Sequence, residues 1–166
     1  MLSPYLAQPP CEPNLEAQRT AMKKLDFLVG KWSGEGSVQR GPGAAIEFAQ
    51  TEEVQSKLDG LVLLIEGTGR NRSDGKVAFR ALATVAWDEE AAAYRFRAFN
   101  DGRYLETELK LAETGKGFAW GFNFGPGKTS YTMRINEKGE WTEVGEYLAD
   151  GQSPRKIIQL TVRPQR

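Results

Sequence analysis

The sequence predicts an all-β protein, an antiparallel up-and-down β-barrel of about ten strands with one N-terminal α-helix. Only one segment shows helical spacing of its apolar residues, and it lies near the N-terminus. The rest consists of short alternating runs separated by turn signals at intervals of roughly 8 to 12 residues. Most connections are too short for parallel crossovers, so neighbouring strands are expected to be antiparallel.

Composition sets the bounds of this prediction. The chain has 166 residues, enough for a single domain, and its 22 basic side chains balance 22 acidic ones. The basic excess of a nucleic-acid-binding protein is therefore missing, and we expect no nucleic-acid partner. The chain contains no histidine and a single cysteine. These counts exclude a histidine general base, a disulfide framework and a thiolate metal cluster, and we expect neither a metal nor a cofactor.

Residues 1–13 are expected to form an extended arm, because they contain four prolines. The arm has no basic start and no long apolar run, so it does not read as an intact signal peptide. No apolar stretch approaches the length of a membrane helix, and no membrane partner is expected. The compartment is cytoplasmic by default, or extracellular if a leader was removed. Cys11 lies in the arm and is interpreted as an incidental thiol.

Residues 14–166 are expected to form one barrel domain, which opens with a helix from Asn14 to Val29. Asn14 is a good N-cap, and Glu16 lies in the first turn. Met22 and Leu25 belong to an apolar stripe at helical spacing, and Gly30 follows the last helical residue. The helix is expected to cover one end of the core, or else to act as a mobile lid over a ligand entrance.

The middle of the chain allows a strand register to be predicted. Asp101-Gly102 suits a two-residue hairpin turn, which pairs Phe96 with Thr107 and Tyr94 with Leu109 on one face. The other face then pairs Arg97 with Glu106 and Arg95 with Glu108. This agreement predicts an outer ladder of ion pairs rather than an anion site.

The same counting extends to the other hairpins. It pairs Val54 with Ile65, Leu109 with Trp120, Thr107 with Phe122, Trp120 with Tyr131, and Met133 with Glu143. Each step keeps the aromatic residues on one face, and a slip of one residue would send the whole set to the other face. The sheet is therefore expected to roll up with its aromatic face inside.

The inward register predicts a ligand-binding interior. Two carboxylates would lie among the rings, and a solid core does not accept unpaired charges. The expected ligand-binding residues are Gln50, Glu52, Trp87, Tyr94, Phe96, Thr107, Trp120, Phe122, Tyr131, Met133, Trp141, Glu143 and Tyr147.

Three functions remain open at this point. The first is binding of a small, mainly apolar molecule inside the barrel. The second is an enzyme in which the interior carboxylates Glu52 and Glu143 act as acid and base, and these two are its candidate catalytic residues. The third is a ligand-free structural or interaction module, such as a homodimer joined through the outward residues Val62 and Leu64.

The segment Leu25-Asp-Phe-Leu-Val-Gly-Lys-Trp32-Ser-Gly-Glu-Gly-Ser-Val38 resembles the calycin superfamily, in which a short helix precedes a Gly-x-Trp motif on the first strand. It is most similar to lipocalin-like bacterial domains of unknown function that are related to nitrobindin-like and fatty-acid-binding-protein-like barrels. The resemblance implies a lipocalin-like fold. It also implies that Trp32 packs near the closed end of the barrel, with Arg163 of the last strand as its cation–π partner.

The resemblance does not transfer a ligand. Nitrobindin-like proteins hold haem through a histidine, which this chain lacks. Fatty-acid-binding proteins hold a carboxylate with an Arg-x-Tyr pattern on the last strand, and the run from Arg155 to Arg163 contains no tyrosine.

Overall fold

The computed structural model describes residues 12–39 and 41–165. Cys11 and nearly all of the expected arm lie outside the described residues. The helical elements are α1 (Leu15–Lys23) and two 3₁₀ turns, η1 (Asp26–Leu28) and η2 (Leu58–Gly60). The strands are β1 (Gly30–Val38), β2 (Ile46–Lys57), β3 (Val62–Asn71), β4 (Val77–Asp88), β5 (Ala93–Asn100), β6 (Arg103–Leu111), β7 (Gly117–Phe124), β8 (Gly127–Ile135), β9 (Trp141–Ala149) and β10 (Arg155–Pro164).

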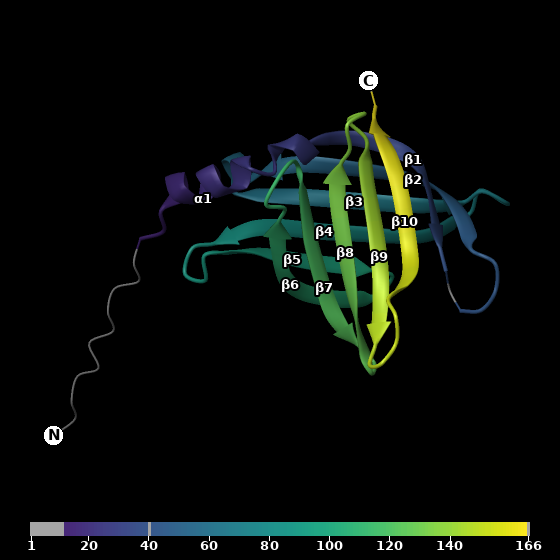
Figure 1. Ribbon diagram of the computed structural model, residues 1–166. Helices are drawn as coiled ribbons and strands as arrows, with labels where there is room; N and C mark the ends of the chain where they lie inside the picture. Colours follow the sequence, from purple (N-terminus) through teal and green to yellow (C-terminus); the bar gives the residue numbers. More distant parts are fainter. Residues whose placement is uncertain (1–11, 40, 166) are drawn as a thin grey trace.

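The ten strands form one closed barrel in which each strand pairs with its neighbours in the chain, and β1 pairs with β10. All of these pairings are antiparallel. Figure 1 shows α1 lying at one end of the barrel, beside the turns that join β2 to β3 and β4 to β5. The predicted fold class is confirmed.

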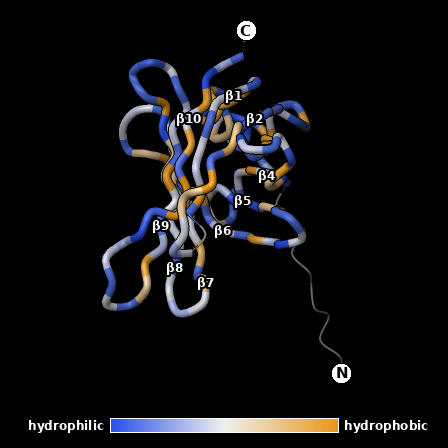
Figure 2. The backbone as a smooth tube through the Cα atoms, turned by 90° about the vertical axis from the view of Figure 1, so that its right-hand side faces the viewer, coloured by the Kyte–Doolittle hydropathy of each residue, from blue (hydrophilic) through white to orange (hydrophobic). Residues whose placement is uncertain are grey.

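The β5–β6 register is confirmed, since Phe96 lies opposite Thr107 and Tyr94 opposite Leu109. Val54 also pairs with Ile65, and Met133 pairs with Glu143. Hydrophobic and hydrophilic residues are interspersed along the strands (Figure 2), as expected when one face of the sheet lies inside a barrel.

The β6–β7 pairing is shorter than predicted. The ladder contains Lys110 with Ala119 and Leu111 with Phe118, and it does not continue to Leu109 with Trp120 or Thr107 with Phe122. Beyond these pairs the hydroxyl of Thr107 donates a 2.8 Å hydrogen bond to the carbonyl of Gly121. A side chain therefore bridges the two strands where the backbone ladder has ended.

The predicted single helix from Asn14 to Val29 is wrong in its extent. Asn14 does cap α1, because its side chain accepts a 3.0 Å hydrogen bond from the backbone N–H of Ala17. However, α1 ends at Lys23 and the chain continues as the 3₁₀ turn η1. This turn buries Leu28.

The helix end of the barrel is filled by a hydrophobic core. Met22, Leu25 and Leu28 of the helical segment are buried against inward side chains of the strands, including Val54 and Leu109. Two hydrogen bonds join the layers. The hydroxyl of Tyr94 donates to the carbonyl of Ala21 at 2.7 Å, and Nε1 of Trp32 donates to the carbonyl of Leu28 at 2.8 Å.

The expected contact between Trp32 and Arg163 is not present. Trp32 is buried, and its ring meets that of Trp141 edge to face at 5.8 Å between centroids. Arg163 lies opposite Ser33, so strand alternation places its side chain on the outer face. There Nε of Arg163 lies 2.7 Å from Oε1 of Glu140.

The predicted outer ladder of ion pairs is half correct. Arg97 pairs with Glu106 at 3.1 Å, as expected. Arg95 lies opposite Glu108 in the register, but its guanidinium forms its ion pair with Asp88 at 2.9 Å. The side chain thus turns toward the β4–β5 corner.

Candidate functional site

A cavity of about 700 Å³ occupies the half of the barrel away from α1. Among its lining residues, Asn100, Arg103 and Phe124 flank the turns at the end opposite the helix. The other end is closed by the hydrophobic core beneath α1 and η1. The cavity is therefore reached from the end that carries the β5–β6 and β7–β8 turns.

The cavity exists because one wall is built from small residues. The inward positions of β3, β4 and β5 that line it include Gly67, Ala81, Ala83 and Ala98. A barrel of about eight strands is just wide enough to be filled by ordinary side chains, and the ten strands here enclose a wider interior. The alanines leave part of this interior unfilled, whereas the space beside Gly67 is taken by the carboxyl group of Glu52.

The wall formed by β7 and β8 is aromatic. The rings of Trp120 and Tyr131 are stacked, with centroids 4.1 Å apart and planes at 4°. Phe122 continues the stack, since its ring lies at 12° to that of Tyr131. Phe96 of β5 packs against Trp120, with ring centroids 4.8 Å apart. Together these rings present a large apolar surface to the cavity.

The floor of the cavity is polar and contains Gln50, Glu52 and Glu143, which sit above the core. Nε2 of Gln50 donates a 2.6 Å hydrogen bond to Oε1 of Glu52. Nε1 of Trp141 donates to Oε2 of Glu143 at 3.3 Å. Gln50 is almost fully buried, and its Oε1 has no hydrogen-bond partner among the described residues.

Burial shifts the acidity of both carboxyl groups. Desolvation raises the pKa of Glu52 to about 8, opposed by the hydrogen bond from Gln50 and assisted by the charge of Glu143. Desolvation likewise raises the pKa of Glu143 to about 7, opposed by the hydrogen bond from Trp141. Near neutral pH the floor therefore holds at least one proton between two acids.

Gly67 makes room for Glu52. It lies opposite Glu52 in the β2–β3 ladder, and a Cβ atom there would lie 2.8 Å and 2.9 Å from the two carboxyl oxygens. The carboxyl group therefore occupies the space that a side chain at position 67 would take.

The structure divides the expected ligand-binding residues into two groups. Eight of them line the cavity: Gln50, Glu52, Phe96, Trp120, Phe122, Tyr131, Trp141 and Glu143. The other five do not line it: Trp87, Tyr94, Thr107, Met133 and Tyr147.

The five excluded residues have structural contacts instead. Trp87 and Tyr94 meet edge to face at 4.8 Å in the half of the barrel that α1 covers. Met133 is completely buried in the core, and Thr107 bridges β6 and β7. Tyr147 packs edge to face against Phe124 at the opposite end. Strand alternation predicted that these residues face inward. It could not predict at which level along the barrel axis side chains fill the interior.

Several lining residues were missed by the sequence analysis. Phe79 and the alanines of β4 and β5 line the cavity, as do Arg103 and Asn123 at its entrance. A signal for the small wall was present in the alternation of alanine at positions 81 and 83 of β4. It was missed because only large side chains were considered as lining residues.

Neither a metal site nor a membrane-spanning helix is found in the described part of the chain. No group of three or more cysteine or carboxylate side chains within 12–39 and 41–165 is placed to hold a metal ion. In the same segments, no helix combines the length and hydrophobicity that crossing a membrane requires.

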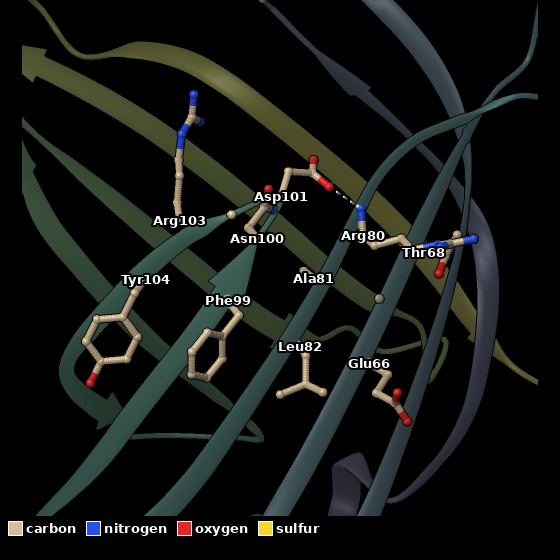
Figure 3. A pocket seen from close by; sticks show the side chains of 12 residues that line it. Glu66, Thr68, Arg80, Ala81, Leu82, Phe99, Asn100, Asp101, Arg103 and Tyr104 are labelled. Carbon is tan, nitrogen blue, oxygen red and sulfur yellow. Dashed lines mark hydrogen bonds between the residues drawn. The ribbon is translucent and has the colours of Figure 1, made fainter.

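A second hollow, of about 590 Å³, lies on the outer face of the barrel near the β5–β6 turn (Figure 3). Leu82, Phe99 and Tyr104 stand side by side there on three adjacent strands. The exposed fractions of Phe99 and Tyr104 are 49% and 59%. This exposure exceeds that of Val62 and Leu64, the outward residues singled out from the sequence, which are half-buried.

No protein-family model matches the chain, and no curated protein matches it. Among solved structures, the chain is similar to the crystal structure of Rv2717c from M. tuberculosis, with a TM-score of 0.70. The match has 15% sequence identity and covers 88% of this chain and 98% of that one. A similarity at this identity shows that the two proteins share a barrel fold.

Proposed function

We propose that this protein binds a small, mainly apolar molecule inside its barrel. The observation that carries the proposal is the cavity of about 700 Å³, with an aromatic wall and a polar floor. This volume is within the range of small-molecule sites, which are mostly apolar and contain a few convergent polar groups. The rings supply apolar area at about 25 cal/mol per Å² buried, and the floor orients the ligand's polar end.

The proposal is tested by blocking the cavity. Ala81 faces the cavity from β4, so Ala81→Phe directs a ring into the unfilled space. Thr84 lies on the outer face of the same strand, opposite Leu64, and Thr84→Phe is the matched control. The neutral dye N-phenyl-1-naphthylamine, followed by its fluorescence, serves as the probe. Saturable binding lost in Ala81→Phe and kept in Thr84→Phe supports the proposal, whereas equal binding in all three proteins rejects it.

We also propose that the chain is a lipocalin-like member of the calycin superfamily. The up-and-down order of the closed barrel supports this assignment, as does Trp32 packing beneath η1 at the closed end. A sequence-profile match from newly sequenced relatives that spans Gly30 and Trp32 would test it. Relatives that place this motif in a different barrel topology would contradict it.

Acid–base catalysis is a second candidate, favoured by the raised pKa values of Glu52 and Glu143. One carboxyl group is then protonated while the other is available as a base near neutral pH. For any substrate that the wild-type protein converts, Glu52→Gln and Glu143→Gln are each expected to abolish turnover. Unchanged rates in both variants would reject this candidate.

Contact with a second copy of the chain is a third candidate, favoured by the exposed rings of Phe99 and Tyr104, whose centroids are 5.3 Å apart. Light scattering measures the mass in solution. A dimer that dissociates in Phe99→Ser supports this candidate, and a monomer at all concentrations rejects it.

A further inference from the structure

The cavity floor offers hydrogen-bond acceptors and lacks a positive charge to complement them. Glu52 and Glu143 project from β2 and β9 toward the same space, and Gln50 lies beside Glu52 on β2. Oε1 of Gln50 is a third acceptor, buried and without a partner in the described chain. A buried polar atom without a partner is destabilising, so this one marks a position where a ligand's donor fits.

The charge distribution along the cavity also disfavours an anionic ligand on the floor. Arg103, at the entrance beside the β5–β6 turn, is the one basic side chain among the described cavity-lining residues. The floor thus has no cation to hold the carboxylate of a fatty acid. An anion placed there would instead face two acids in a medium of low dielectric constant.

Resting on the proposed function, we infer that the ligand is a lipophilic primary amine whose ammonium group lies on the floor between Gln50, Glu52 and Glu143. A primary ammonium carries three N–H donors, which match one amide oxygen and two carboxyl groups. Its apolar body extends along the stacked rings of Trp120 and Tyr131 toward the entrance. Hydrogen bonds between charged partners are stronger than neutral ones, and in this site they form away from water.

The test compares four ligands with the same chain length: octylamine, octan-1-ol, octanoate and octyltrimethylammonium. Isothermal titration calorimetry of the full-length protein measures each affinity. Octylamine is expected to bind about tenfold to a hundredfold more tightly than octan-1-ol, since charged hydrogen bonds replace neutral ones. Octanoate is expected to bind most weakly. Octyltrimethylammonium has no N–H donor and is expected to lose most of the affinity that octylamine gains over octan-1-ol.

Protein variants test whether the preference for octylamine depends on the two carboxyl groups of the floor. The double variant Glu52→Gln/Glu143→Gln keeps the shape of the floor and is expected to lose the preference for octylamine while still binding octan-1-ol. Glu53→Gln removes a carboxylate from the outer face, where Glu53 lies 3.9 Å from Lys31, and is expected to behave as wild type. Circular dichroism confirms that each variant is folded before titration.

The outcomes separate the inference from the proposed function. Equal affinity for octylamine and octan-1-ol, or for octylamine and octyltrimethylammonium, overturns the inference and leaves ligand binding intact. A preference that survives in Glu52→Gln/Glu143→Gln also overturns it. If none of the four ligands binds and N-phenyl-1-naphthylamine does not bind either, the proposed function fails and the inference fails with it.

Discussion

Gln50 donates a 2.6 Å hydrogen bond to Glu52, two residues further along β2, and both side chains lie on the inner face of the barrel. The contact holds a carboxyl group of raised pKa at the level where the packed core ends and the cavity begins. The polar floor thus has an energetic cost for the fold, and this cost depends on pH.

The stability of the protein should fall as pH rises from about 5 to about 8. In this window the unfolded chain has released the protons of Glu52 and Glu143, while the folded chain keeps them until their raised pKa values are reached. Each unit of raised pKa lowers stability by about 1.4 kcal/mol once both states are ionised. The free energies of unfolding of wild type and Glu52→Gln, measured with urea, should therefore differ by a few kcal/mol more at pH 8 than at pH 5.

Toward pH 8, Glu52→Gln should be more stable than wild type, because glutamine carries no charge to bury. Glu53→Gln, on the outer face, should give curves parallel to wild type. If the stability of wild type relative to Glu52→Gln stays constant or rises between pH 5 and pH 8, Glu52 is ionised in the folded protein at little cost.

Removing the indole N–H of Trp32 should loosen the closed end. Trp32→Phe leaves the buried carbonyl of Leu28 without its 2.8 Å donor, and we expect a loss of about 1–3 kcal/mol, besides a packing loss. Trp87→Phe is the comparison, because Trp87 lies half-buried in the same half of the barrel. Chemical denaturation measures both. A smaller loss for Trp32→Phe than for Trp87→Phe would contradict the assigned role.

The hydroxyl of Tyr94 should hold α1 against the barrel. Tyr94→Phe removes its 2.7 Å hydrogen bond to the carbonyl of Ala21, at an expected cost of about 1–2 kcal/mol. Hydrogen–deuterium exchange should become faster in α1 than elsewhere. Tyr147→Phe, at the opposite end, should leave exchange in α1 unchanged. Equal exchange of α1 in wild type and Tyr94→Phe would rule out this tether.

A methyl group at position 67 should compete with the carboxyl group of Glu52 for the same space. Gly67→Ala is expected to destabilise the fold by about 1–3 kcal/mol, since its Cβ falls within 3 Å of the carboxyl oxygens and the carboxyl group can move away only by disturbing its hydrogen bond with Gln50. Combining Gly67→Ala with Glu52→Ala should recover part of this loss. A double-mutant cycle from urea unfolding measures the coupling. Strictly additive effects would mean that Glu52 moves aside freely.

The hairpin registers could be read from the sequence because they are local. A turn such as Asp101-Gly102 fixes which residues lie opposite one another, and the two-residue period then decides which face each side chain shares. This logic placed Phe96, Trp120 and Tyr131 on the inner face together with Glu52 and Glu143. It failed for the β6–β7 ladder, where a Thr107 side-chain hydrogen bond replaces backbone pairing that the turn alone would predict.

The candidate site depended on contacts between residues far apart in the chain. Tyr94 and Met133 face inward as predicted, but they belong to the core, because Ala21 and its neighbours fill their half of the barrel. Arg95 turned to Asp88 rather than to Glu108, since a long side chain selects among several acids within reach.

The sequence by itself determined the antiparallel order of the strands and the common face of the aromatic and acidic residues, since both follow from local turns and a two-residue period. Only the tertiary structure decided which half of the interior is filled and which is left open. That division follows from α1 and η1 packing into one end and from alanines lining the other, and no local pattern specifies how such distant segments share a volume.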